Sequence, residues 1–214
     1  MIKVIYEDNH LLVVEKPENV PMQEDSSKDE DLLSLCKAYI KEKYSKPGDV
    51  YLGLVHRLDR PVGGVVVFAR TSKAASRLSK QIQDHSFKKE YLAVVEDNSL
   101  PDEGHLIDKL LKDPKTNTVK VDNRGKQAEL DYKLIRRKDN LALVRVFLKT
   151  GRSHQIRVQC ASRNHPLWGD QRYNPKAKVG QQIALHASRI EFEHPITKER
   201  MAFESSATRY PFDV

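Results

Sequence analysis

The chain has 214 residues, of which 39% are hydrophobic, and a formal net charge of +7 at pH 7. This length and composition suit one large domain over residues 1–214, with a sizeable core. The basic excess favours a polyanionic partner such as nucleic acid over an acidic small molecule. No apolar run is long enough to cross a bilayer and no leader opens the chain, so we expect a cytoplasmic protein without membrane contact.

The first part of the chain mixes strands with two helices. Residues 29–44 predict a helix, because apolar residues recur at spacings of three and four after an acidic first turn. A second helix should start at a cap made by Thr71 or Ser72. Four apolar runs predict strands: 4–6, 11–14, 52–55 and 65–69.

The second part is mostly strand. One short helix is expected at 154–162, after the turn at Thr150-Gly151. The expected strands are 90–95, 105–110, 118–121, 128–135, 141–148, 183–192 and 201–203. Short sequential strands favour antiparallel pairing, so we predict an α+β fold with a central mixed, mostly antiparallel sheet flanked by helices.

The segment from His56 to Gly64 carries the clearest chemical signal. Asp59 lies between Arg57 and Arg60, in a loop stiffened by a proline and two glycines. Flanking positive charge favours an ionised carboxylate, which suits attack on an electron-poor carbon better than proton delivery. An isolated Arg-x-Asp is more often a turn with a surface ion pair, so other residues must decide its role.

Several further segments accompany this loop in a fixed order. Thr150 to Arg157 reads Thr-Gly-Arg-Ser-His-Gln-Ile-Arg. The others are Lys16-Pro17, 87–95, 165–170 with Tyr173, and 185–187 with Phe192 and His194-Pro195. In these segments the chain resembles the RluA-type RNA pseudouridine synthases over nearly its whole length. Many members carry Thr-Ser where this chain has Val62-Gly63, so any hydrogen bond from those hydroxyls must be lost or replaced by water.

The resemblance implies a pseudouridine synthase fold with the catalytic loop in a basic cleft, and a single catalytic domain without an N-terminal S4-like RNA-binding domain. It implies that Asp59 is the catalytic carboxylate and that Arg157 pairs with it. Tyr91 would stack on the target base and move a proton. Arg57 would fill the gap left by the flipped base, and Ile156 would pack beneath that base.

The residues leave several points open. Asp59 could attack the base at C6, attack the sugar at C1′ or abstract a sugar proton, and we favour the last. Apart from the resemblance, Arg157 would be read as a phosphate contact or a surface helix residue, and Ile156 as ordinary core. His56 and His154 are expected to be hydrogen-bonded scaffold rather than metal ligands or bases.

Other basic side chains could contact RNA, although charged runs usually form solvated faces. We select Arg152, His154 and Arg136 as substrate contacts. Further candidates for this path are Arg137, Lys138, Arg145, Lys149, Arg163 and Arg172. Cys36 and Cys160 show no metal-ligand spacing and should be reduced core residues, and we expect neither a metal nor a cofactor.

The leading hypothesis is an enzyme that isomerises specific uridines in structured RNA, either tRNA or rRNA, to pseudouridine. Removing a base from its stack for chemistry implies base flipping. We expect a monomer. The alternative is a catalytically silent RNA-binding or chaperone protein on the same fold, against which the presence of Asp59, Tyr91 and Arg157 argues. A general DNA-binding protein is a third hypothesis, but no helix-turn-helix or finger pattern supports it.

Overall fold

The computed structural model describes residues 2–96 and 99–214, and the chain divides into two compact units. The first unit comprises Met1–Lys88 and Ala187–Ser206. The second comprises Lys89–His186 and Ala207–Val214. Each unit is therefore built from two separate pieces of the chain. A single functional domain over residues 1–214 stays a prediction.

The first unit is a sheet whose strands run in the order β1-β2-β4-β10, with β3 paired to β4 and β11 paired to β10. The register of β2 and β4 is antiparallel and runs from Leu11 opposite Ala69 to Lys16 opposite Gly64. Lys16 therefore lies where β4 begins, directly after the loop that carries Asp59. The strands are β1 (Lys3–Glu7), β2 (Leu11–Lys16), β3 (Gly53–Leu54), β4 (Gly63–Ala69), β10 (Leu185–Glu193) and β11 (Arg200–Glu204).

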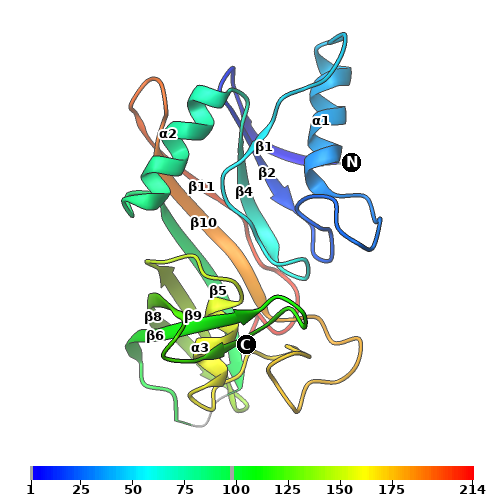
Figure 1. The fold of residues 1–214 in the computed structure, drawn as a ribbon. Coiled ribbons are helices and arrows are strands. Elements are labelled where there is room, and N and C mark those ends of the chain that lie inside the picture. The colour runs from blue at the N-terminus through cyan, green and yellow to red at the C-terminus, as the bar shows by residue number, and fades with distance from the viewer. Residues whose placement is uncertain (1, 97–98) are drawn as a thin grey trace. The chain divides into compact units, whose positions relative to one another are not determined.

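Two helices flank these strands (Figure 1). Helix α1 (Leu32–Lys43) begins three residues later than the sequence predicts, because Asp31 is its cap and accepts a hydrogen bond from the Ser34 amide. The predicted acidic first turn is thus wrong, since no acidic residue lies in that turn. Helix α2 (Ser72–Gln83) is capped by Thr71, whose side chain accepts from the Ala74 amide at 3.1 Å.

The core of this unit follows the alternation of its strands. Leu11 and Val13 of β2 and Val65 and Val67 of β4 lie in one cluster with the apolar face of α2. The next residues along β2, Leu12 and Val14, point to the other face and are also 0% exposed. Both faces of the sheet are therefore covered, as the continuous apolar runs of its strands require.

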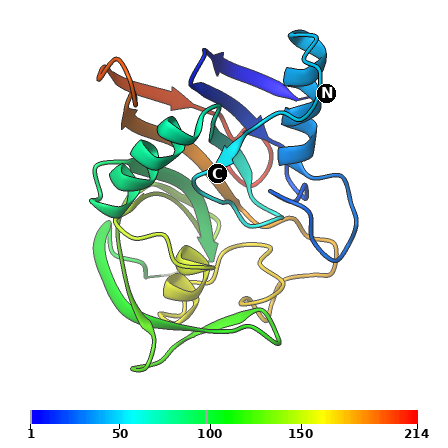
Figure 2. The same ribbon diagram turned by 45° about the horizontal axis from the view of Figure 1, so that its top comes forward.

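The second unit is an antiparallel sheet in the order β5-β9-β8-β6-β7. Its green strands curve around the short helix α3 (Figure 2). Val158 of that helix packs against Leu110, Val119 and Ala128 of the sheet. The elements are β5 (Lys88–Glu96), β6 (Glu103–Asp113), β7 (Thr118–Val121), β8 (Lys126–Lys138), β9 (Leu141–Leu148) and α3 (Gln155–Ala161). The predicted α+β class is confirmed, and so is each predicted strand and helix.

The cysteine prediction is also confirmed. Cys36 and Cys160 are buried and free. Burial raises the pKa of each thiol to about 12, so neither forms a thiolate near neutral pH. Among the described residues, no helix has the length and apolarity to cross a membrane.

Candidate active site

The Asp59 loop joins β3 to β4 in the first unit. The Val62 amide donates a hydrogen bond to the Asp59 carbonyl at 2.9 Å, which closes a turn over Arg60 and Pro61. Asp59 is partly buried and Arg57 is exposed. The turn therefore presents the carboxylate at a bend of the backbone.

Lys16 anchors this loop from beneath. Its side chain is 1% exposed, and its Nζ donates hydrogen bonds to the carbonyls of Pro17 at 2.9 Å, Arg60 at 2.9 Å and Val62 at 2.7 Å. These three bonds use all three protons of an ammonium group. Burial lowers the pKa of Lys16 to about 7, against the opposing effect of the negative charges of Asp59 and Glu18. The sequence alone predicts no role for Lys16.

Two other residues fix the start of β4. The Nε2 atom of buried His56 accepts a hydrogen bond from the Val67 amide at 3.1 Å, which makes this histidine a scaffold residue, as predicted. Gly64 has φ +126°, and a Cβ there would lie 2.2 Å from the carbonyl oxygen of Ala187 in β10. Any side chain at this position would break the pairing of β4 with its neighbour.

The two arginines that flank Asp59 have different surroundings. Arg60 donates to the Asn19 carbonyl and the Ser27 hydroxyl, and it pairs with Asp29. It therefore holds the segment before α1. The part of the chain that the structure describes offers no hydrogen bond or ion pair to Arg57. Of the two, Arg57 is the arginine available to a substrate.

In the second unit, Arg157 forms a buried bidentate pair with Asp170. Its Nε and Nη2 donate to the two carboxylate oxygens at 2.8 and 2.7 Å, and the side chains are 7% and 0% exposed. A planar fork held at two points has a fixed orientation. The residue is thus neither a surface helix residue nor a simple phosphate contact. Its pairing with Asp59 stays a prediction.

Tyr173 extends this pair into a network. Its ring lies under the Arg157 guanidinium, 5.2 Å from the centroid, and its hydroxyl oxygen accepts from the Val119 amide at 2.9 Å. The same hydroxyl shares a hydrogen bond with Nδ1 of His154, 2.7 Å away. His154 is therefore hydrogen-bonded scaffold, as predicted, and its left-handed φ of 51° places it immediately before α3.

Gln155 fixes the turn that precedes α3. It is 3% exposed, and its Oε1 accepts from the Thr150 hydroxyl at 2.8 Å and the Arg152 amide at 3.0 Å. Its Nε2 donates to the Glu129 carbonyl of β8 at 3.1 Å. The next residue, Ile156, is buried at 4% exposure. Gln155 thus links the turn to the sheet.

Tyr91 lies on β5 and is 7% exposed. Little of the ring is therefore open to solvent. This burial is compatible with a ring that contacts a base only after that base has left its stack. The core packing expected of an ordinary strand tyrosine would give the same burial. The role of Tyr91 in catalysis therefore stays a prediction.

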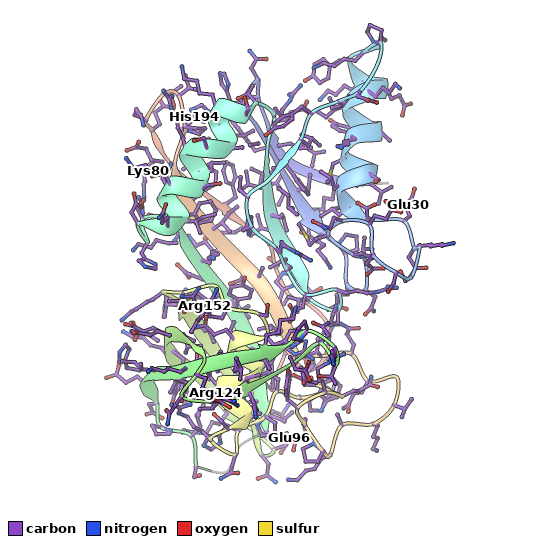
Figure 3. All side chains as sticks on the ribbon, in the orientation of Figure 1. Glu30, Lys80, Glu96, Arg124, Arg152 and His194 are labelled. Atoms are coloured by element: carbon purple, nitrogen blue, oxygen red, sulfur yellow. The ribbon has the colours of Figure 1, made fainter. Side chains whose placement is uncertain are left out.

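The side chains predicted to contact RNA fall into two groups: those that bind backbone carbonyls and those that pair with carboxylates. Arg152, labelled in Figure 3, is exposed and donates from Nε to the Gln127 carbonyl at 2.8 Å. Arg136 is exposed and donates to the Phe212 carbonyl at 3.1 Å. Several of the other predicted cations already face carboxylates: Arg137 with Asp102, Arg145 with Glu90, Lys149 with Glu129 and Asp131, and Arg163 with Asp108. These pairs neutralise part of the expected basic path.

The second unit also contains a cavity of about 330 Å³. Its wall includes Leu106, Tyr132, Val146 and Cys160. Of the residues predicted for the site or the RNA path, Arg163 lines it, and none of the predicted catalytic residues does. Within residues 2–96 and 99–214, no group of three potential metal ligands comes together.

Comparison with known proteins identifies the family. The sequence profile described as RNA pseudouridylate synthase matches residues 10–162, a range that includes Asp59, Tyr91 and Arg157. The chain belongs to this family. Its members isomerise uridine to pseudouridine in RNA. The chain therefore belongs to a family of isomerases.

Curated relatives support this assignment over most of the chain. The ribosomal large subunit pseudouridine synthase D of Zymomonas mobilis is 34% identical over 95% of this chain and 68% of its own length. An uncharacterized RNA pseudouridine synthase of Bacillus subtilis is 32% identical over the same shares. The ribosomal large subunit pseudouridine synthase C of Vibrio parahaemolyticus is 31% identical over 92% of this chain and 63% of its own length. The chain thus spans roughly two thirds of these relatives.

Solved structures support the fold. Human RNA pseudouridylate synthase domain containing 4 matches with a TM-score of 0.81 and 20% identity, over 99% of this chain and 90% of that one. The human domain containing 1 matches with a TM-score of 0.75 and 20% identity, over 97% and 84%. The predicted pseudouridine synthase fold is confirmed.

Two supports of the site, Lys16 and Asp170, are not predicted from the sequence. Both lie in segments that carry the family resemblance, but the resemblance implies no function for either. Lys16 could have been recognised from alternation, because it shares a strand face with Leu12 and Val14, and a lysine on a buried face needs partners. Asp170 follows a glycine in an irregular segment, and no periodicity there indicates burial.

Proposed function

We propose that the chain is an RNA pseudouridine synthase that uses Asp59 as its catalytic carboxylate. The reaction breaks the N-glycosidic bond of a uridine, turns the freed uracil and joins it to the sugar through carbon. It needs a carboxylate held in a fixed place, and the observation that carries the proposal is the Lys16 anchor. Two hydrogen bonds from one buried ammonium hold carbonyls of the Asp59 turn, those of Arg60 and Val62, and a third ties the turn to Pro17 after β2.

Other residues take the roles that the family resemblance implies. Arg157 keeps Asp59 ionised and aimed, with its own fork oriented by Asp170. Tyr91 stacks on the target base and moves a proton, and Ile156 packs beneath that base. Arg57, exposed on the loop, takes the place of the flipped base in the RNA.

The proposal also covers the RNA contacts, the oligomeric state and the location of the protein. Arg152 and Arg136 contact phosphates from the second unit, and His154 supports the binding surface through Tyr173. The protein acts as a monomer in the cytoplasm, with neither metal nor cofactor, in a cleft where basic residues surround the Asp59 loop. The whole of residues 1–214 acts as one catalytic domain.

The substrate proposed is a uridine in the RNA of the large ribosomal subunit. Two of the relatives described above are named for that subunit. The net charge of +7 suits binding to a folded polyanion of this kind. A uridine in tRNA is the competing substrate.

The first test compares the wild type with Asp59→Asn, which keeps the shape of the side chain and removes its charge and basicity. Pseudouridine is mapped in ribosomal RNA and tRNA from cells that lack the gene and carry either form. We expect the wild type to restore one or more sites in large-subunit RNA and Asp59→Asn to restore none.

The purified proteins are then assayed in EDTA on an RNA fragment that needs no divalent ion to fold. We expect the wild type to be active and Asp59→Asn to bind this RNA within a few-fold of the wild-type affinity. Substantial turnover by Asp59→Asn would remove Asp59 from the mechanism. Binding without turnover by the wild type on any RNA would favour the silent RNA-binding protein.

A further inference from the structure

The Lys89 side chain has unusual surroundings. Lys89 is the second residue of β5 and is partly buried. Among the described residues, no carboxylate, carbonyl or hydroxyl forms a hydrogen bond or ion pair with its ammonium group. Burial lowers the pKa of Lys89, as expected for a cation that has lost water and gained no partner.

The neighbours of Lys89 on its strand face are apolar or aromatic. Side chains two residues apart on a strand point to the same face, so Lys89 and Tyr91 lie side by side. Their partners on β9 are Leu148 and Val146. Glu90 points to the opposite face and lies 3.9 Å from Arg145. The carboxylate nearest in sequence is therefore directed away from Lys89.

The turn before α3 leaves space for the Lys89 ammonium. A Cβ added to Gly151 would lie 2.9 Å from Nζ of Lys89. The backbone on both sides of Gly151 is fixed, because Gln155 accepts from the Thr150 hydroxyl and the Arg152 amide. The ammonium group therefore rests against a rigid turn rather than moving freely in solvent.

A cation held in this way reduces the stability of the protein. Loss of hydration without a compensating partner is unfavourable. A buried charge without a partner is typical of a functional site, where a bound ligand supplies the missing partner. The ligand must carry negative charge on an oxygen, and it must reach the strand face that Tyr91 shares.

We propose that Lys89 and the Gly151 turn form a subsite that binds an anionic oxygen of the RNA substrate beside Tyr91. This inference rests on the proposed function. Two sources of that oxygen fit the chemistry: a backbone phosphate of the target nucleotide, and a uracil oxygen that gains charge when the glycosidic bond breaks.

The test uses Lys89→Met, which keeps length and removes charge. Lys88→Met is the matched control, since it makes the same change at the adjacent residue, which is exposed, points to the other face and donates to the His85 carbonyl. RNA affinity is measured at several salt concentrations in the Asp59→Asn background. Single-turnover rates are measured with Asp59 present.

Two results would support the subsite and identify its oxygen. If Lys89 binds a phosphate, Lys89→Met weakens RNA binding about tenfold and lowers the slope of log K against log salt by about 0.7 to 0.9 relative to Lys88→Met. If it binds a uracil oxygen, affinity stays at the control level and the single-turnover rate falls about 100-fold, as when one donor to a developing oxyanion is removed.

Gly151→Ala provides a second variant that keeps all charges. The added methyl must displace the flexible end of Lys89, so we expect the same kind of defect at smaller size. Thermal melting separates binding from folding: Lys89→Met should melt no lower than the wild type, because it removes an uncompensated charge. A lowered melting temperature would mean that Lys89 supports the fold.

Equal affinity, salt slope and rate in Lys89→Met and Lys88→Met would overturn the subsite. The proposed function would survive that result if the wild type made pseudouridine. Conversely, a wild-type protein that makes no pseudouridine on any RNA would refute the proposed function, and the salt slopes would still decide whether Lys89 binds phosphate.

Discussion

The Asp59 loop and the α3 region hold their charged residues in different ways. Lys16 binds the Asp59 loop through backbone carbonyls, whereas Asp170 binds Arg157 through its side chain. A carbonyl is present whatever the side chain, so the loop can change its sequence and keep its anchor. This explains how Val62-Gly63 can replace Thr-Ser without loss of support. The Arg157 pair has no such tolerance, because each partner must keep its shape and charge.

The largest effect is expected from Asp170→Asn. The change removes the negative charge that meets the buried Arg157 fork at two points, which should lower the free energy of unfolding by about 3 to 5 kcal/mol. Urea denaturation measures this loss. Asp102→Asn is the control, since Asp102 pairs with Arg137 at 3.0 Å with a side chain that is 81% exposed, and it should change stability by less than about 1 kcal/mol. Equal losses in the two variants would show that the Arg157 pair contributes no more than a surface pair.

Lys16→Met tests the other side of the comparison. The carbonyls of Pro17, Arg60 and Val62 lose their shared donor, so the loop should shift and turnover should fall about 100-fold, the cost of a misplacement near 1 Å. RNA affinity should stay within a few-fold.

Lys3→Met is the control for this change, because Lys3 is an exposed lysine of the same sheet that pairs with Glu15. Turnover is measured under saturating RNA for both variants. Full activity in Lys16→Met would mean that the backbone of the loop keeps its position without the ammonium.

A smaller effect concerns pH. Burial lowers the pKa of Lys16 from 10.5 to about 7, so its third donated hydrogen bond is lost as pH rises through that value. Turnover should fall by up to about tenfold per pH unit above 7, in step with the loss of the protonated form. The profile is measured as single-turnover rate from pH 6 to 9.

Stability should change in the opposite direction. The unfolded chain holds more protons on Lys16 than the folded chain between pH 7 and 10.5, so the contribution of this residue to the free energy of unfolding rises with pH across that range. Lys16→Met should lack this contribution. A turnover that rises above pH 7 while stability falls would contradict both assignments.

The sequence predicted what depends on local pattern. Alternation and spacing gave the strands and helices, and Thr71 was one of two expected caps. The sequence pattern predicts too early a start for α1, because Asp31 is the cap of this helix and not one of its helical residues. The contacts of Lys16 with Arg60 and Val62 could not be predicted, since they join residues far apart in the chain that only the pairing of β2 with β4 brings together. The Asp170 pair likewise depends on how the segment after α3 folds back.

The two-piece construction of the first unit has a consequence for synthesis on the ribosome. Its core combines Leu11, Val13, Val65 and Val67 with Ile190 and Phe192, which belong to the returning segment Ala187–Ser206. The ribosome adds the residues of β2 and β4 early. These apolar residues stay exposed to aggregation until Ile190 and Phe192 emerge, about 10 s later at ordinary elongation rates. Strand β4 has no β10 beside it during that interval. Folding of this unit therefore waits until residues 187–206 have been made, so a chain cut short before Ala187 cannot complete the core of the first unit.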